Sequence, residues 1–84
     1  MFQLYESVVL EENDEYWMPD DLPIRATIVR VTEKSCWLKC PEAPAYEKVY
    51  FDRRDGECYS MRQLRPSIRH ITQEDHAAWE AAGK

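Results

Sequence analysis

The chain has 84 residues, of which 44% are hydrophobic and 32% are charged, and its formal net charge is −5. This length supports a single domain with a thin core and leaves little room for the deep cleft of a small-molecule enzyme. The composition excludes a disordered chain, and no apolar run approaches the roughly 20 residues that cross a bilayer.

The charge is distributed unevenly. Residues 1–24 carry seven acidic and no basic side chains, residues 25–69 carry ten basic and six acidic ones, and residues 70–84 carry three acids and one lysine. Such an uneven distribution of charge is more informative about binding partners than about the fold. The first ten residues have no basic start, so we expect no secretory signal. An odd number of cysteines does not make a disulfide framework, and we therefore expect a cytoplasmic protein.

Five short strands are predicted from alternation and from strand-forming residues. The segment 24–40 holds the densest run of strand formers and reads as a hairpin that turns at Glu33 and Lys34, so we expect the rest of the chain to pack on it. Gly56 should take a positive φ in a second hairpin loop. Pro66 should end this unit, and residues 60–65 could form a helical turn instead of extending the last strand. The strands are expected at residues 2–10, 24–32, 35–40, 46–52 and 57–61.

One helix is predicted over residues 73–82. Thr72 is a good N-cap and Asp75 lies three residues later, an imperfect capping box, while Gly83 suits the C′ position. Trp79 is the one large apolar side chain of this helix and should dock on the sheet. The expected fold is α+β: a small twisted antiparallel sheet, or a partly open barrel, of about five strands with a C-terminal helix. A flat sheet covered by the helix is the alternative.

The first candidate site is an acidic segment in residues 11–21, between two predicted strands. A connection of this length in a small domain is often functional, and it places a tyrosine and a tryptophan among carboxylates. The aromatics could anchor a partner protein with a basic surface while the carboxylates steer the encounter. Alternatively, Trp17 folds back on the core and the acids only keep the chain soluble. The candidate partner-binding residues are Glu11, Glu12, Asp14, Glu15, Tyr16, Trp17, Asp20 and Asp21.

The second candidate site is a cluster of arginines near aromatic residues of the last two predicted strands. Small barrels bind single strands with such side chains, although a net charge of −5 opposes a polyanion. These arginines could instead pair with the chain's own acids. The candidate nucleic-acid-binding residues are Tyr50, Arg53, Arg54, Tyr59, Arg62 and Arg65.

Metal binding and catalysis are not expected. Cys36 and Cys40 lie on one predicted strand with Cα atoms roughly 13 Å apart, too far to share one zinc ion, so these cysteines should be buried thiols. Neither His70 nor His76 has a partner at a spacing that indicates an oriented acid–base pair, and the chain has no glycine-rich phosphate loop. We expect no catalytic residue, no cofactor and no metal.

Two stretches, ATIVRVTEKSCWLK and ITQEDHAAWEAAGK, resemble in general character small proteins of phages and mobile elements. That class includes anti-restriction and anti-CRISPR proteins, which are often small, acidic, metal-free binders of host machinery. The resemblance covers about half of the chain and transfers no functional residue. It implies a non-enzymatic protein-binding module, with an inhibitor of a host nucleic-acid-handling complex as its most concrete form and a nucleic-acid-binding small barrel as the alternative.

Overall fold

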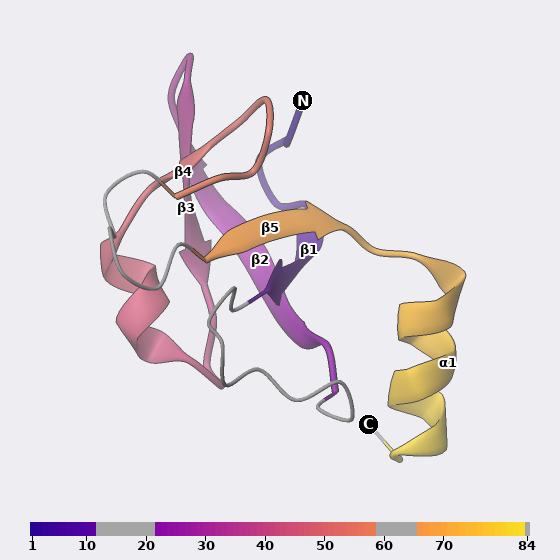
Figure 1. Ribbon diagram of the computed structural model, residues 1–84. Helices are drawn as coiled ribbons and strands as arrows, with labels where there is room; N and C mark the ends of the chain where they lie inside the picture. The colour runs from indigo at the N-terminus through magenta and orange to yellow at the C-terminus, as the bar shows by residue number, and fades with distance from the viewer. Residues whose placement is uncertain (12–21, 59–65, 84) are drawn as a thin grey trace.

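The computed structural model describes residues 1–11, 22–58 and 66–83, and its centre is the hairpin of β2 (Ile24–Val31) and β3 (Ser35–Lys39). The other strands are β1 (Ser7–Glu11), β4 (Phe51–Asp52) and β5 (Ser67–His70). The order across the antiparallel sheet is β4-β3-β2-β1-β5, so the last strand pairs with the first (Figure 1). The helix α1 (Gln73–Ala81) lies at one side of this sheet, and the 3₁₀ helix Pro44–Lys48 lies at the other.

The sheet closes almost completely because the chain around Gly56 joins its two edges. On one side, the amide of Asp52 in β4 donates to the carbonyl of Glu57 over 2.9 Å. On the other, the amide of Ile68 in β5 donates to the carbonyl of Gly56 over 2.8 Å, and the amide of Cys58 donates to Pro66 over 3.1 Å. Gly56 has a φ of +76°, as its place in the loop predicts. The expectation of a small barrel with a C-terminal helix is therefore confirmed.

Alternate residues of every strand enter one core inside the barrel, which is the pattern expected when one face of a sheet is buried. In β3, Cys36 and Leu38 point inward while Trp37 and Lys39 point outward, as the alternation of side chains along a strand requires. The core consists of Phe2, Val8, Leu10, Ala26, Ile28, Cys36, Leu38, Cys40, Tyr46, Phe51, Cys58 and Ile68.

The strand predicted over residues 2–10 is shorter than expected. A tight turn precedes β1, in which the amide of Glu6 donates to the carbonyl of Gln3 and Tyr5 has a φ of +66°. Phe2 still reaches the core, but Leu4, two residues later in the predicted strand, is exposed. The alternation of this segment therefore comes from two separate pieces of chain rather than from one strand.

Two further expectations are wrong. The first three residues of the strand predicted over residues 46–52 belong to the 3₁₀ helix Pro44–Lys48, because a proline suits the first turn of a helix, and only Phe51–Asp52 pairs with β3. The fifth strand is β5, after Pro66, rather than residues 57–61, of which residues 59–61 lie outside the described chain and Glu57 makes an isolated bridge to Ser67. The predicted helix is one residue shorter, and its Thr72–Asp75 capping box is complete.

Candidate partner-binding site

Of the predicted acidic segment, the structure describes Glu11 and not residues 12–21. Glu11 ends β1, and its Oε1 accepts a hydrogen bond from the Nε of Arg69 in β5. Both side chains are partly exposed. The chain thus uses one predicted partner-binding carboxylate for an ion pair of its own, and this leaves Glu12, Asp14, Glu15, Tyr16, Trp17, Asp20 and Asp21 as candidates outside the described residues.

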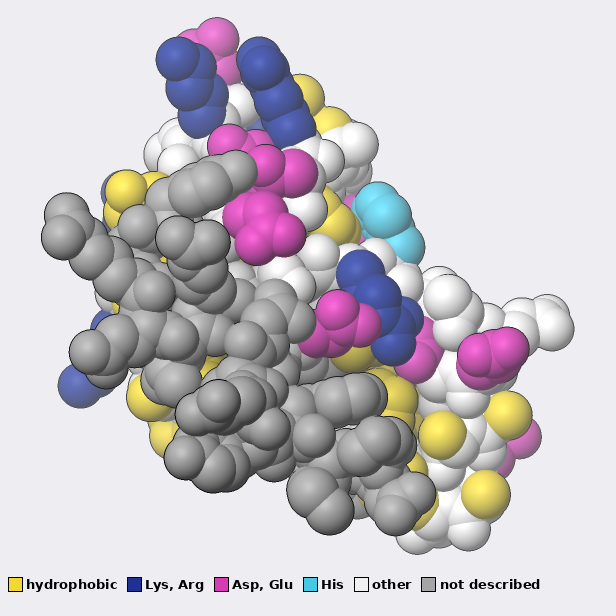
Figure 2. Space-filling view, in the orientation of Figure 1, with side chains coloured by type: hydrophobic (Ala, Val, Ile, Leu, Met, Phe, Trp, Pro, Cys, Tyr) yellow, Lys and Arg dark blue, Asp and Glu magenta, His cyan; other side chains and the backbone are white. Residues whose placement is uncertain are grey.

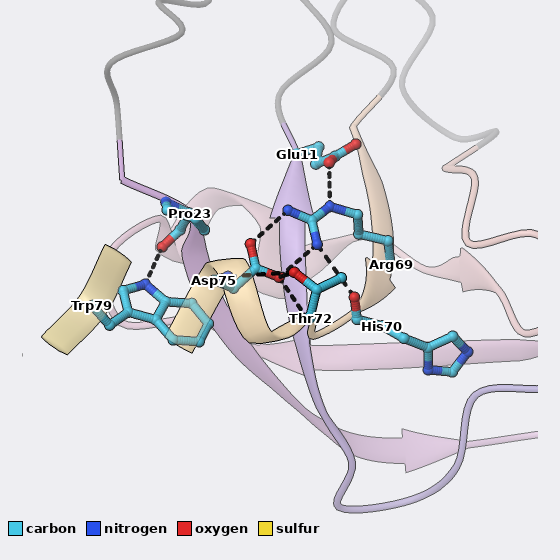
Figure 3. Close-up of polar contacts among 7 residues, drawn as sticks. All are labelled: Glu11, Pro23, Arg69, His70, Thr72, Asp75 and Trp79. Atoms are coloured by element: carbon cyan, nitrogen blue, oxygen red, sulfur yellow. Dashed lines mark hydrogen bonds and ion pairs between the residues drawn. The ribbon is translucent and has the colours of Figure 1, made fainter. Parts of the chain in front are cut away.

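Arg69 also binds the start of α1. Its Nη1 and Nη2 donate to the two carboxylate oxygens of Asp75 over 2.7 and 2.8 Å, the bidentate geometry in which arginine binds carboxylates most strongly. The same carboxylate accepts from the amide and hydroxyl of Thr72, at 2.8 and 3.0 Å. The hydrogen bonds from Arg69, followed by those from Thr72, hold the pKa of Asp75 well below its usual value. Figure 3 shows the guanidinium of Arg69 between Glu11 and Asp75.

The other end of the acidic segment is attached to the same helix. The indole Nε1 of Trp79 in α1 donates to the carbonyl of Pro23 over 2.7 Å, immediately before β2 begins (Figure 3). The ring of Trp79 is buried, and the guanidinium of Arg25 in β2 lies 4.2 Å from its centroid. The predicted docking of Trp79 on the sheet is confirmed, although the contact runs through an arginine as well as through apolar surface.

These two attachments share one row on the outer face of the sheet. Val9 in β1 lies opposite Arg25 on one side and opposite Arg69 on the other, and directly opposed residues point to the same face. Arg25 contacts Trp79 and Arg69 binds Asp75, so Val9 is buried between the two arginines that contact the helix. In Figure 2, acidic and basic side chains lie against one another at the junction of the sheet and α1.

The predicted nucleic-acid-binding set is only partly described, and its members have different roles. Arg53 is used within the chain: its Nε donates to the carbonyl of Phe2 over 2.9 Å, and its Nη1 donates to the carbonyl of Thr32 over 2.7 Å. Arg54 and Tyr50 are exposed. Tyr59, Arg62 and Arg65 lie outside the described residues.

Sequence reasoning missed an aromatic row on the outer face of β2, β3 and the residue before β4. The ring centroids of Trp37 and Tyr50 are 6.1 Å apart, and the guanidinium of Arg30 lies 4.5 Å from the Trp37 centroid. Arg30 lies directly opposite Trp37 in the β2–β3 register. The alternation of β3 already placed Trp37 outward, so the missing information was the register, which a β-bulge between Ile28 and Arg30 shifts by one residue.

The cysteines do not form a reactive or metal-binding site in the described chain. Cys36, Cys40 and Cys58 are buried, and no two of them are joined by a disulfide. Burial raises the pKa of Cys36 to about 11 and raises that of Cys40, so both are neutral thiols at physiological pH. Across residues 1–11, 22–58 and 66–83, no three His, Cys, Asp or Glu side chains lie where they could hold a metal ion together.

Helices in the described parts of the chain are too short or too polar to cross a membrane. Comparison with known proteins found no matching family model, no matching curated protein and no matching solved structure.

Proposed function

We propose that the chain is a non-enzymatic protein-binding module that uses the acidic, aromatic segment 12–21 to bind a partner with a basic surface. The observation that carries the proposal is that one helix holds both ends of this segment. Arg69 connects Glu11 to Asp75 in α1, and Trp79 in the same helix binds Pro23. A connection of this length that only kept the chain soluble would not need two such attachments.

Fixing the ends of a binding segment favours association, because less conformational freedom is lost when the partner binds. The attachments differ in kind: one is a charge-assisted network and the other is a buried indole with a hydrogen bond. Since Leu10 and Ile24 are paired residues of β1 and β2, the segment also leaves and enters the sheet at neighbouring positions. These features support a binding segment whose two ends are fixed to the folded domain.

Because Glu11 is occupied, the proposed binding charge comes from five carboxylates: Glu12, Asp14, Glu15, Asp20 and Asp21. They would raise the rate of encounter with a basic surface, an effect that weakens as salt increases. Tyr16 and Trp17 would supply the anchors, since Trp and Tyr are enriched among residues that dominate binding energy. A partner that handles nucleic acid suits this surface, because such proteins carry basic grooves.

The most concrete form of the proposal is an inhibitor of a nucleic-acid-handling complex, as the resemblance to small phage and mobile-element proteins suggests. The proposed location is the cytoplasm, which keeps thiols reduced, and no two of the three cysteines are joined by a disulfide. A non-enzymatic role is supported by the neutral state of Cys36 and Cys40, neither of which is a nucleophile at physiological pH.

The test compares two variants with equal charge change. The segment variant combines Trp17→Ala with Glu12→Gln, Asp14→Asn and Glu15→Gln. The control variant neutralises three exposed acids elsewhere: Glu33→Gln, Glu74→Gln and Glu80→Gln. Each serves as bait for affinity purification from native cells with quantitative mass spectrometry, and thermal unfolding verifies that both baits are folded.

The expected result is a partner that the wild type and the control variant capture and that the segment variant loses. With purified components, the affinity for this partner should fall as salt rises. If the folded segment variant retains the same partners as the control variant, the segment is not the binding surface and the proposed function is wrong.

A further inference from the structure

We infer that the outer face of β2 and β3 binds single-stranded nucleic acid through a row formed by Tyr50, Trp37 and Arg30, with Lys39 beside it. This site is separate from the acidic segment and from the arginines predicted for nucleic acid. The row runs across the sheet: Arg30 pairs with Trp37 between β2 and β3, and Tyr50 precedes the residue of β4 that pairs with Cys36. All four side chains therefore point outward from the barrel.

The aromatic part of the row is accessible. Tyr50 is 43% exposed, and its ring lies 6.1 Å from that of Trp37 at an interplanar angle of 52°. Val29, at the bulge beside Arg30, is also exposed, so this face has apolar surface that the described chain leaves uncovered. Aromatic side chains on neighbouring strands of a sheet are the platform on which proteins stack unpaired bases.

The cations of this face are available to phosphate groups. Within the described residues, Arg53 and Arg69 are occupied by acceptors of the chain itself, whereas neither Arg30 nor Lys39 makes an ion pair. Arg30 lies on the Trp37 ring, and a guanidinium that stacks on an aromatic face keeps its N–H groups for other acceptors. Lys39 projects from β3, two residues from Trp37 on the same face.

One described carboxylate on the same face as the row, that of Asp52, is used within the chain. The Oδ1 of Asp52 accepts a 2.7 Å hydrogen bond from the amide of Arg54 within the turn. The acidic segment connects to β2 at its other end, because Ile24 lies six positions before Arg30, or roughly 20 Å of strand. That distance is about twice the screening length at physiological salt. The net charge of −5 is a sum over the whole chain and does not by itself exclude a polyanion from this face.

The ligand class follows from the combination. Exposed aromatics alone would fit many partners, and cations alone would fit any acidic surface. Stacking rings beside cations that form no ion pair with the described residues match a chain of unpaired bases joined by phosphates. An acidic peptide shares only the charge, and it enters the experiment as a separate ligand.

The experiment uses fluorescence anisotropy of the purified full chain with labelled oligonucleotides of about 12 nucleotides, a length within the usual site size of small barrels. Oligodeoxythymidine and oligouridine distinguish DNA from RNA, and a labelled polyglutamate peptide provides the acidic-peptide comparison. The variants are Tyr50→Ala, Arg30→Gln and Lys39→Gln, and the matched control is Arg54→Gln, which removes one exposed cation from the 53–56 loop.

The expected result is oligonucleotide binding at low salt that Tyr50→Ala weakens roughly 5- to 100-fold, as loss of one stacked base does. Arg30→Gln and Lys39→Gln should each make the slope of log affinity against log salt shallower by about 0.7, the value for one phosphate contact on a single strand. Arg54→Gln should change neither quantity.

Three results would overturn the inference: no binding to either oligonucleotide at low salt, a loss in Arg54→Gln equal to that in Arg30→Gln, or binding of polyglutamate in place of both oligonucleotides. None of these depends on Trp17 or on the carboxylates of the acidic segment. Failure here therefore leaves the proposed function standing, and failure of the partner experiment leaves this inference standing.

Discussion

Gly56 is the residue at which the closure of the barrel can be tested most directly. A Cβ atom at this position would lie 2.1 Å from the carbonyl oxygen of Ile68 and 3.1 Å from its carbonyl carbon. Both are backbone atoms of β5, so no side-chain rotation relieves the overlap. In Gly56→Ala, the chain around residue 56 must therefore move away from β5 by roughly 1 Å or more, because a carbon and an oxygen atom in ordinary van der Waals contact lie that much farther apart.

The cost of Gly56→Ala has two parts. A residue other than glycine at a φ of +76° costs about 1–2 kcal/mol. The shift also breaks the hydrogen bonds from Ile68 to Gly56 and from Cys58 to Pro66, which contribute about 1 kcal/mol each. The sum of about 3–4 kcal/mol is a large fraction of the free energy of unfolding of a chain this size. We expect the melting temperature to fall by roughly 12–30 °C.

Gly83 provides a matched control, because it has the same φ of +76° and nothing within 4 Å of a Cβ atom built there. Gly83→Ala should cost only the backbone part, about 1–2 kcal/mol, or roughly 4–16 °C. Circular dichroism during heating and urea titration measures both variants. If Gly56→Ala is no less stable than Gly83→Ala, then the two edges of the sheet do not meet at Gly56 and Ile68.

The remaining predictions concern the helix contact and the thiols. Trp79→Phe should lower the free energy of unfolding by at least about 1 kcal/mol in urea titrations, because the carbonyl of Pro23 loses its donor and the smaller phenyl ring fills less of the space of the buried indole; an unchanged stability would show that neither the bond nor the indole packing contributes. Arg69→Gln should cost about 1–2 kcal/mol, reduced from the usual value of a charged hydrogen-bond pair by partial exposure. The lowered pKa of Asp75 stabilises the fold above about pH 4, the range of an unfolded Asp, and this contribution is lost as pH falls further. The stability difference between the wild type and Asp75→Asn should therefore be constant from about pH 5 to 7 and shrink toward pH 2, whereas a difference independent of pH would contradict the ion pair. Cys36 should react with thiol reagents at about pH 8 only as fast as the chain unfolds, since its pKa is about 11 and it is fully buried; fast labelling of the native chain would contradict its burial.

The helix α1 has a different role from the one that its sequence suggests. Its sequence offers one large apolar side chain, and a nine-residue helix of this kind is marginal by itself. Its attachment depends on two arginines of the sheet, Arg25 and Arg69, which bind Trp79 and Asp75. Trp79 binds Pro23 directly, and Asp75 shares Arg69 with Glu11, so a change in either helix residue should affect helix docking and the proposed partner binding together.

What the sequence determined is local. The inward and outward faces of β3, the Thr72 cap, the positive φ of Gly56 and the existence of a terminal helix all follow from residues within a few positions of one another. Strand alternation, capping and glycine geometry act over that range, so a single sequence contains the information. The errors in the strands at residues 2–10 and 46–52 arose where a turn or a proline interrupted an apparent alternation.

Tertiary structure alone decided which charged and aromatic groups are occupied. Glu11 and Arg69 are 58 positions apart, and Pro23 and Trp79 are 56 apart, so no local pattern indicates that they meet. Strand order and register bring them together, and the bulge in β2 likewise sets Arg30 against Trp37. Whether a side chain is satisfied within the chain depends on those distant pairings, which is why the sequence could not show that Arg53 binds the carbonyls of Phe2 and Thr32 or that Arg30 stacks on Trp37.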